Sequence, residues 1–461
     1  MFDESTYIIR RRALSDQINE GVILLLGNMP VPMNYLSNTL RFRQDSNFLY
    51  YSGLDHPNLN MVIDVPSGET TLFGDDIDID DIVWEGERIT VKKMSALAGI
   101  EHVEKNSFLS QFLSTKNKIH TLPNYREDQR SFLRSIINSK NFSSSKELVV
   151  NVIKQRSIKS KEEVAEIELA LDVTAEMHKI AMKYTRHGVT EQSIVGKIEG
   201  YALEKGRRMA YPVIFTVNGE ILHNNVYTNT MESGQLALND SGSESPLYYA
   251  SDITRTFPVS GYFSDIQKQI YNLVHDMQKV ALDFCKPGTS YKEAHLASAK
   301  KAVEGLTEMG IMSGSPDDAV KEGAHALFFP HGLGHMLGLD VHDMEGLGED
   351  LVGYHDEANR SDQFGLAYLR LSKELVPGFA LTVEPGIYFI PHLMNKWKSE
   401  NKHSNFINYN ALEDFENFGG IRIEDNILIT DEGYRMLGPH IPKTVDDIES
   451  VSYTHLRAHE T

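Results

Sequence analysis

The sequence predicts an α/β domain over residues 1–159, followed by an α+β domain with an internal duplication over residues 160–450. Three observations predict this fold class. Short apolar runs of strand length alternate with helical segments in the first part of the chain. A capping pattern then begins a long amphipathic helix at Ser160. Beyond that helix, a pattern of two helices followed by strands occurs twice.

The composition is that of a globular protein able to bury a large core, with 41% hydrophobic and 24% charged residues among 461. Acidic residues outnumber basic ones by 65 to 45, which gives a formal net charge of −20. That excess argues against nucleic-acid and anionic membrane surfaces as partners. The single cysteine, Cys285, excludes an intramolecular disulfide framework and suits a reducing compartment. Since no apolar run fits a signal peptide or a membrane span, we expect a soluble, cytoplasmic protein.

In the first domain, the spacing predicts a basic helix over 8–19 and a strand over Val22–Leu26, which a Gly-Asn pair ends. Two further strands, over 61–65 and 70–73, are separated by a Pro-Ser-Gly turn and are expected to form a hairpin. The strongly acidic run over 75–87 is interpreted as a solvated loop, with a cation site as the alternative.

The second domain begins with Ser160 and Glu163, which match an S-x-x-E capping box. Apolar residues follow at helical spacing, so this helix buries one face. His178 lies on the same stripe and is interpreted as a hydrogen-bonded core histidine rather than a ligand. Helices are expected to end at 186–190 and again at 286–290, and each is followed by a second helix.

Two short segments of the second domain resemble each other, GQLALNDSG over 234–242 and GFALTVEPG over 378–386. Both place a glycine, a carboxylate and a glycine at the same spacing, and the carboxylates are Asp240 and Glu384. If the domain is duplicated, each half presents a carboxylate at the end of a strand. A chance match between short segments is the alternative.

The segment LALNDSGSESPLYYASDITRTFP contains two strand-like runs joined by a loop, which places Asp240 and Asp252 on the two arms of one hairpin. Asp240 shares strand parity with Leu236 and Leu238, so it projects from an apolar face. A carboxylate in such a place needs a cation or a proton. An ion pair with Arg255 is the alternative.

The segment PHGLGHMLGLDVHD, over 330–343, contains His331, His335 and His342. The first two are four residues apart, as in a helical zinc pair. The glycines around them disfavour a helix, and the glutamate of an H-E-x-x-H motif is missing. Strand or loop geometry must therefore place these histidines, either in a site or as structural residues of a Gly-rich turn.

Two further segments present carboxylates. In ALTVEPGIY, Glu384 ends an apolar strand directly before a Pro-Gly pair, which leaves the carboxylate at the end of the strand. In GGIRIEDNILI, strand alternation puts Arg422 and Glu424 on one face. A simple ion pair between these two residues is the alternative.

Taken together, four carboxylates and one imidazole stand at strand ends of one domain: Asp240, Asp252, His335, Glu384 and Glu424. If they converge, four negative charges cannot share a dry pocket without cations. Oxygen-rich ligation with one imidazole favours Mn²⁺, Co²⁺ or Zn²⁺, with bridging carboxylates holding two ions about 3.5–4 Å apart. Two such ions make a shared water into hydroxide near neutral pH, so the pattern predicts a hydrolase.

The segments ASDITRTFP, HGLGHMLGLDVHD, TVEPGIY and GGIRIEDN, in this order, closely resemble the aminopeptidase P and prolidase branch of the "pita-bread" metallopeptidases. FRQDSNFLYYSG, over 42–53, resembles the N-terminal domain of that branch. The resemblance implies a catalytic domain with a curved antiparallel sheet and outer helices, in a homodimer or homotetramer. Residues 451–461 do not continue the family's ending and are expected to be non-native or disordered.

The resemblance implies that Asp240 binds one metal ion, that Asp252 and Glu424 bridge both ions, and that His335 and Glu384 bind the second. A metal-bridging hydroxide would attack the carbonyl group of an Xaa–Pro peptide bond, and Glu384, or a neighbouring carboxylate, would move the proton toward the leaving nitrogen. The two divalent ions are expected to be Mn²⁺, with Co²⁺ or Zn²⁺ as alternatives.

The resemblance also implies that His223 and His342 act as catalytic residues beside the substrate, and that His331, Arg370 and Arg422 bind or support it. Arg370 falls where prolidase places an arginine that grips the carboxylate of a dipeptide. A surface arginine is the alternative there.

Two features depart from the family pattern. Asp240 and Asp252 are twelve residues apart where eleven are expected, so we expect the extra residue to bulge the loop at Ser245-Pro246. The usual Leu-His-Tyr stands here as Leu-His-Asn around His223, so the substrate pocket is expected to differ in shape at that point.

The predicted function is that of an Xaa-Pro aminopeptidase, which releases the N-terminal residue of peptides with proline in the second position. An Xaa-Pro dipeptidase (prolidase) is the alternative, because both specificities share the metal chemistry. A non-catalytic peptide-binding module on the same fold is a remote alternative, which the presence of all five ligands disfavours. Neither nucleic acid nor a membrane is an expected partner.

Overall fold

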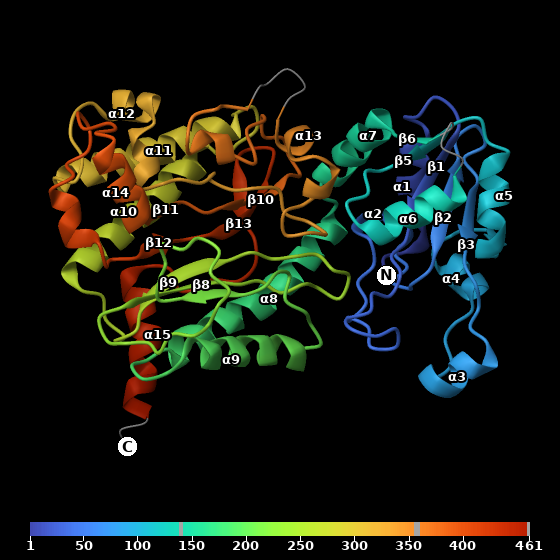
Figure 1. Ribbon diagram of the computed structural model, residues 1–461, viewed down its shortest axis with the longest axis horizontal. Helices are drawn as coiled ribbons and strands as arrows, with labels where there is room; N and C mark the ends of the chain where they lie inside the picture. The colour runs from blue at the N-terminus through green and yellow to red at the C-terminus, as the bar shows by residue number, and fades with distance from the viewer. Residues whose placement is uncertain (138–141, 355–359, 459–461) are drawn as a thin grey trace. The chain divides into compact units, whose positions relative to one another are not determined.

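The computed structural model describes residues 1–137, 142–354 and 360–458. The chain divides into two compact units (Figure 1). Unit 1 comprises Met1–Arg156 with Met344–Gly348, and unit 2 comprises Ser157–Asp343 with Glu349–Thr461. The first division of the chain falls after Arg156.

A six-stranded mixed sheet forms the centre of unit 1, in the order β4-β3-β2-β1-β5-β6. β1 is antiparallel to β2 and parallel to β5, and β2 and β3 form the predicted hairpin. The strands are β1 (Val22–Leu26), β2 (Asn60–Asp64), β3 (Thr70–Phe73), β4 (His102–Glu104), β5 (Ile119–Thr121) and β6 (Phe142–Ser144).

The core of unit 1 lies between this sheet and its helices. β1 is buried along its whole length because it is a central strand with an all-apolar sequence. Leu109 and Leu113 of α5 and Leu133 of α6 belong to one buried apolar cluster with Val22 and Leu24 of β1. The helices are α1 (Glu4–Ser15), α2 (Ser46–Ser52), α3 (Ile79–Glu85), α4 (Val91–Leu97), α5 (Leu109–Ser114), α6 (Glu127–Ile136) and α7 (Lys146–Ser157).

Two N-terminal elements differ from the prediction. α1 begins at Glu4 rather than residue 8, because the side chain of Asp3 caps it by accepting from the Ser5 amide. Part of the acidic run is helical rather than a loop, since Asp78 and Asp81 form a reciprocal capping box at the start of α3. α3 is nonetheless solvated, with no buried residue. Among the described residues, the acidic run contributes to no cluster of three metal-ligating groups.

Unit 2 repeats an order of two helices followed by antiparallel strands (Figure 1). Its long first helix has the predicted capping box between Ser160 and Glu163. The first half consists of α8 (Lys161–Tyr184), α9 (Glu191–Glu204), β7 (Ile214–Thr216), β8 (Leu236–Asp240) and β9 (Thr254–Pro258). The second half consists of α10 (Asp265–Asp283), α11 (Tyr291–Glu308), β10 (Ala380–Val383), β11 (Gly386–Tyr388), β12 (Gly420–Arg422) and β13 (Asp425–Ile429).

The remaining strand of unit 2, β14 (Tyr434–Met436), pairs with β13. The remaining α-helices of the described residues are α12 (Pro316–Glu322), α13 (Glu349–Gly353), α14 (Pro391–Ser399) and α15 (Val445–Ala458). α15 therefore extends into the C-terminal segment 451–461 that the sequence sets apart, and residues 459–461 lie outside the described residues. Within the described ranges, every helix is too short or too polar to cross a bilayer.

The β8–β9 hairpin places the first two predicted carboxylates. Asp240 pairs with Thr254, and the same register continues to a bridge between Glu244 and Ala250. Asp240 and Asp252 consequently lie on one face of the hairpin. The residue by which the Asp240–Asp252 spacing exceeds the family pattern must therefore lie beyond the Glu244–Ala250 bridge. In the turn there, Tyr248 adopts a φ of 70°, and the Ser245 amide donates to the Tyr249 carbonyl at 2.8 Å.

A second antiparallel ladder places the other two carboxylates. β10 pairs with β13 up to Val383 and Asp425, and β11 pairs with β12 from Gly386 and Arg422 onward. Both ladders have the same register, so Glu384 and Glu424 stand opposite each other in the gap between them. Side chains opposite each other share a face of a sheet, which directs both carboxylates to one side.

Candidate metal centre

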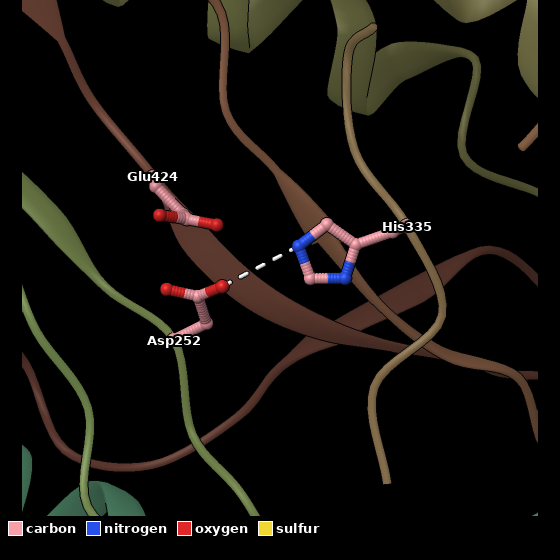
Figure 2. Close-up of side chains that lie close together, drawn as sticks. All are labelled: Asp252, His335 and Glu424. Carbon is pink, nitrogen blue, oxygen red and sulfur yellow. Dashed lines mark ion pairs between the residues drawn. The ribbon is translucent and has the colours of Figure 1, made fainter. Parts of the chain in front are cut away.

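Three buried side chains from separate segments form a candidate metal site. Asp252, His335 and Glu424 each offer one ligand atom, and these atoms lie within 4.8 Å of one another. Figure 2 shows the three side chains converging, with His335 Nε2 3.4 Å from Asp252 Oδ2. Asp252 precedes β9, His335 lies in the Gly-rich loop, and Glu424 stands between β12 and β13.

The other two predicted ligands lie beside this cluster. Glu384 Oε1 is 3.6 Å from His335 Nε2. Asp240 Oδ2 accepts a hydrogen bond of 2.5 Å from the Arg422 guanidinium. The Tyr211 hydroxyl lies 2.6 Å from Asp240 Oδ1 and also contacts Asp252 Oδ1. All five predicted ligands line one cavity of about 620 Å³.

The arginines of the two ion pairs considered from the sequence, Asp240–Arg255 and Arg422–Glu424, have other partners in the structure. Arg255 pairs with Asp425 at 2.7 Å rather than with Asp240. Arg422 pairs with Asp240 rather than with Glu424. Glu424 Oε2 instead accepts from the Thr254 hydroxyl at 2.8 Å. Glu424 is therefore a buried carboxylate held by a neutral hydroxyl.

The carboxylates raise one another's affinity for protons. Burial raises the pKa of Asp240 and Glu424, and it raises the pKa of Glu384 to about 7. Repulsion among the acidic groups adds to this rise, while Arg422 opposes it. Burial alone would lower the pKa of His335, but the Asp252 and Glu384 carboxylates raise it. Such a set binds positive charge, either as protons or as cations.

The donor set fits divalent metal ions. Glu424 Oε1 is buried and has no hydrogen-bond partner within the described structure, so it is open to a ligand. His335 Nδ1 lies 3.1 Å from the Met336 carbonyl, to which its N–H donates a hydrogen bond. That bond fixes the tautomer whose Nε2 lone pair faces the carboxylates, as metal-binding histidines require. Carboxylate oxygens with one imidazole suit ions such as Mn²⁺, Co²⁺ or Zn²⁺.

His331 has both ring nitrogens occupied by protein groups. Nδ1 lies 2.8 Å from the Gly332 carbonyl, and Nε2 lies 2.9 Å from the Tyr388 hydroxyl. Nδ1 therefore carries the proton, and the Tyr388 hydroxyl donates to Nε2. The same hydroxyl accepts from Arg422 at 3.0 Å, which joins His331 to Arg422 and Asp240 in one hydrogen-bonded chain.

His223, His342 and Arg370 also line the cavity, as the sequence analysis expects for residues near a substrate. Burial lowers the pKa of His223 and lowers that of His342 to about 2, so both imidazoles are neutral near pH 7. Arg370 is one-third exposed and has Glu349 at 3.3 Å. It thus stands in the cavity wall rather than on an outer surface. Apolar side chains complete the wall: Leu222, Val341, Phe364, Tyr368, Ile390 and Leu393.

Sequence reasoning did not identify two tyrosines of the site, Tyr211 and Tyr388. Tyr211 comes before β7, whose Ile214 pairs with Asp240. Tyr388 lies within the TVEPGIY motif, two residues after Gly386 on β11. A polar residue on a buried strand, on the same face as a predicted ligand, was the available signal for Tyr388. Tyr211 precedes its strand and had no such signal.

Comparisons with known proteins agree with this geometry. Residues 165–431 match the model of metallopeptidase family M24, and residues 7–121 match that of the aminopeptidase P N-terminal domain. The chain is 31% identical to the Xaa-Pro dipeptidase of Homo sapiens, over 94% of this chain and 89% of that protein. It is 32% identical to a probable Xaa-Pro aminopeptidase of Sclerotinia sclerotiorum, over 94% of this chain and 77% of that one.

Solved structures show the same likeness. Aminopeptidase P of Escherichia coli with the inhibitor Pro-Leu superposes with a TM-score of 0.82 at 28% identity, covering 99% of both chains. An aminopeptidase of Pseudomonas aeruginosa gives a TM-score of 0.82 at 29% identity, covering 98% of this chain and 99% of that one. The family models account for the N-terminal α/β fold and for the pita-bread fold of unit 2. This chain therefore belongs to metallopeptidase family M24, in its aminopeptidase P and prolidase branch.

Proposed function

We propose that this chain is an Xaa-Pro aminopeptidase that works with two divalent cations. Mn²⁺ is the expected metal, with Co²⁺ or Zn²⁺ as alternatives. The observation that carries the proposal is the convergence of four carboxylates and one imidazole on one cavity, with a buried Glu424 oxygen open to a ligand. Four buried acidic groups without cations would be strongly unfavourable at neutral pH. The relatives named for Xaa-Pro cleavage support the choice of substrate.

Five residues would hold the cations: Asp240, Asp252, His335, Glu384 and Glu424. Asp252 and Glu424 lie in one three-residue cluster with His335, which supports all three as ligands. When bound, divalent cations lower the pKa of water and polarise a carbonyl group. Glu384 would carry a proton to the leaving proline nitrogen, a role supported by its position at the cavity and by burial, which raises its pKa to about 7.

The remaining polar residues of the cavity would orient the peptide. His223 and His342 are neutral and face the cavity, so each can donate one hydrogen bond to a substrate carbonyl. Arg422 is held by Asp240 and Tyr388, and it would support the substrate end of the site together with His331. The expected substrates are peptides with proline in the second position.

A single cysteine suits a reducing compartment, so we propose a cytoplasmic location.

We propose residues 1–159 and 160–450 as the functional domains and a homodimer or homotetramer as the assembly. Both proposals rest on the resemblance to the aminopeptidase P and prolidase branch.

An Xaa-Pro dipeptidase is the second candidate, and one observation favours it. Arg370 stands in the cavity wall, where a guanidinium could pair with the free carboxylate of a dipeptide. An aminopeptidase that accepts longer peptides has no need of that pairing. The two specificities therefore differ in what Arg370 does, and they agree on the metal chemistry.

Paired substrates test both functions. Metal-stripped protein is supplied with Mn²⁺, Co²⁺ or Zn²⁺ and offered an Xaa-Pro dipeptide and an Xaa-Pro-Xaa tripeptide, and the released products are measured. Tripeptide cleavage that is lost in chelator and in Glu424→Ala supports the aminopeptidase. Cleavage of the dipeptide alone, abolished by Arg370→Ala, assigns a dipeptidase. Absence of turnover with every metal leaves the peptide-binding module.

A further inference from the structure

A buried ion pair lies next to the metal centre without lining its cavity. Lys159 Nζ is 2.9 Å from Asp343 Oδ2, and each side chain is only 1% exposed. Burying two charges costs several kcal/mol per ion, by order of magnitude, so such a pair is weak support for stability on its own. It sets geometry, however, because each charge can stay buried only where the other meets it.

The Asp343 carboxylate organises the loop that carries two site histidines. Its Oδ1 accepts from the Asp340 amide at 3.4 Å, and the Asp343 amide donates to the Met336 carbonyl at 2.9 Å. The loop is closely packed around this carboxylate, since a Cβ on Gly338 would lie 2.3 Å from Asp343 Oδ2. His342 directly precedes Asp343, so the position of the carboxylate sets where the His342 backbone lies.

Lys159 links this loop to the strand that leads to Glu384. Its backbone amide donates to the Gly378 carbonyl at 2.8 Å, just before β10 begins. Gly378 adopts a φ of 92°, in the left-handed region, and a Cβ there would lie 2.8 Å from the side chain of Ile158. One residue therefore contacts both the β10 turn, through its backbone, and the histidine loop, through its side chain.

The two ends of the histidine loop are held by different contacts. At the His335 end, the His335 amide donates to Thr382 Oγ1 at 3.1 Å, and the Thr382 amide donates to the His335 carbonyl at 3.0 Å. At the His342 end, the backbone contacts converge on Asp343, while the His342 ring packs against the His335 ring with centroids 4.1 Å apart. Losing the ion pair should therefore move His342 more than His335, because the His335 backbone keeps its own contacts with Thr382.

We propose that Lys159 and Asp343 are positioning residues, whose buried ion pair holds the His342 imidazole against the substrate cavity. The inference rests on the proposed function, in which His342 faces the peptide. Misplacing a group that positions the substrate by about 1 Å can lower the rate about 100-fold. A small shift of this loop is therefore enough to reduce kcat. Neither residue needs to touch the substrate.

The test uses a double variant that removes both charges. Lys159→Met with Asp343→Asn keeps the side chains close to their original size and leaves no buried charge unpaired. Lys116→Met is the matched control, because Lys116 pairs with Asp64 at the same 2.9 Å within unit 1. Melting temperature and the number of Co²⁺ ions bound, followed by visible absorption, report whether the fold and metal centre survive.

We expect the double variant to melt near the wild-type temperature, to bind Co²⁺ in the same number, and to lose about 100-fold in kcat with a smaller change in KM. In a His342→Ala background the same pair of substitutions should cost little more, because the residue they position is gone. Lys116→Met should leave kcat unchanged. If the two substitutions lower kcat by the same factor in the His342→Ala background as in the wild type, the proposal is overturned.

A second readout does not depend on turnover. Carbon–proton spectra of histidine-labelled protein contain one His342 signal, identified by its absence in His342→Ala. We expect this signal to shift in the double variant and the His335 signal to shift less, because the two rings lie 4.1 Å apart but the His335 backbone keeps its contacts with Thr382. An unmoved His342 signal contradicts the ion-pair proposal even if the wild type is inactive, whereas a wild type inactive on both Xaa-Pro substrates contradicts only the proposed function. If the double variant does not fold, Lys159→Gln with Asp343→Asn provides the same comparison, because it too leaves no buried charge unpaired.

Discussion

At the scale of single residues, the Arg422 guanidinium holds several side chains of the metal centre at once. It donates to Asp240 Oδ2 at 2.5 Å, to Thr254 Oγ1 at 3.1 Å and to the Tyr388 hydroxyl at 3.0 Å. The flat fork of an arginine reaches these partners from one fixed position, which the single ammonium group of lysine cannot reproduce. Arg422 thus fixes where Asp240 stands before any metal ion arrives.

Arg422→Lys should therefore weaken metal binding although the charge is kept. Loss of such an outer contact typically costs 10–100-fold in metal affinity, so we expect a decrease of about that size for Mn²⁺. Titration calorimetry on metal-stripped protein measures it. Arg435→Lys is the control, because Arg435 pairs with Glu168 on the exposed surface of unit 2. An unchanged affinity in Arg422→Lys would show that Asp240 needs no such support.

His178 is the core histidine that its helical stripe predicts, and its contacts explain its charge state. It is fully buried on α8, its Nε2 donates to the Ser241 carbonyl at 3.1 Å, and its Nδ1 accepts from the Asn239 amide at 3.1 Å. The second bond requires the neutral ring, because Nδ1 can accept only when it carries no proton. Burial lowers the pKa of His178 to about 4, below its usual value of 6.5.

This lowered pKa makes His178 a source of acid sensitivity. Below pH 6.5 the unfolded chain binds a proton that the folded protein excludes, so stability falls as pH falls toward about 4. The slope from one such residue is up to about 1.4 kcal/mol per pH unit. In metal-free buffer, the stability deficit of His178→Gln relative to the wild type should shrink as pH falls from 7 to 5. Urea unfolding at several pH values measures it, and parallel curves would contradict it.

At the scale of elements, the hairpin that carries Asp240 and Asp252 depends on a residue without a side chain. Gly242 stands across from Asp252, and a Cβ there would lie 1.8 Å from the Ser251 carbonyl oxygen. No shift of a flexible side chain relieves this contact, because the atom it meets belongs to the opposite strand. Gly200, in the middle of α9, has nothing within 4 Å of its would-be Cβ.

Gly242→Ala should therefore open the hairpin at its carboxylates, lowering stability by about 1–3 kcal/mol, as overpacking of a tight core does. It should weaken metal binding too, because Asp252 moves with the strand. Gly200→Ala should instead stabilise the protein by about 0.5–1 kcal/mol, since alanine suits a helix interior. Thermal unfolding with and without Mn²⁺ separates the loss of stability from the loss of metal binding in Gly242→Ala. Equal melting temperatures for the Gly242→Ala and Gly200→Ala variants would refute the steric argument.

A single side chain of unit 1, Arg11 of α1, connects α1 to the ends of α2 and α4. Its buried guanidinium donates to the Tyr51 carbonyl at 2.8 Å and to the Ala98 and Gly99 carbonyls at 2.9 Å. These carbonyls stand at the ends of α2 and α4, where a helix leaves acceptors unpaired. The arginine therefore completes two helix ends together.

Arg11→Met should destabilise unit 1 by about 3 kcal/mol, because removing a charged donor leaves buried carbonyl groups unsatisfied. Its neighbour Arg12 is exposed on the same helix, so Arg12→Met is the matched control and should change stability by less than about 0.5 kcal/mol. Urea unfolding of the full chain measures both. Similar losses in the two variants would mean that charge alone, rather than the carbonyl contacts, matters.

The elements also show how far sequence patterns reach. Ser160 and Glu163 locate the start of α8 because a capping box is a contact between residues close in sequence. The start of α1 was misplaced because its cap, Asp3, lies outside the apolar spacing that predicted the helix. In the metal centre, motif residues such as Asp252 and Glu424 are predictable from strand ends. Tyr211 is not, because its contact with both aspartates exists only after β7 has paired with β8.

At the scale of the whole molecule, the two halves of unit 2 each supply two of the converging carboxylates. The β8–β9 hairpin brings Asp240 and Asp252, and the ladder of the second half brings Glu384 and Glu424. A duplicated fold thus makes a cluster of like charges that neither half would form alone. Such a cluster opposes folding until cations neutralise it, so metal binding and the stability of unit 2 are linked.

Metal removal should consequently lower the stability of unit 2 in a way that one tryptophan reports. The chain has two tryptophans, Trp84, which is 85% exposed on α3, and Trp397, which is 2% exposed on α14 of unit 2. In a Trp84→Phe variant, the fluorescence of Trp397 follows unfolding of unit 2. Saturating Mn²⁺ at about a thousand times its Kd should stabilise unit 2 by about 4 kcal/mol relative to chelator, by mass action. Glu424→Ala should abolish most of this gain, because the buried carboxylate that contacts Thr254 and stands within reach of Asp252 and His335 is then missing. A gain of equal size in Glu424→Ala would place the stabilising ions elsewhere in the chain.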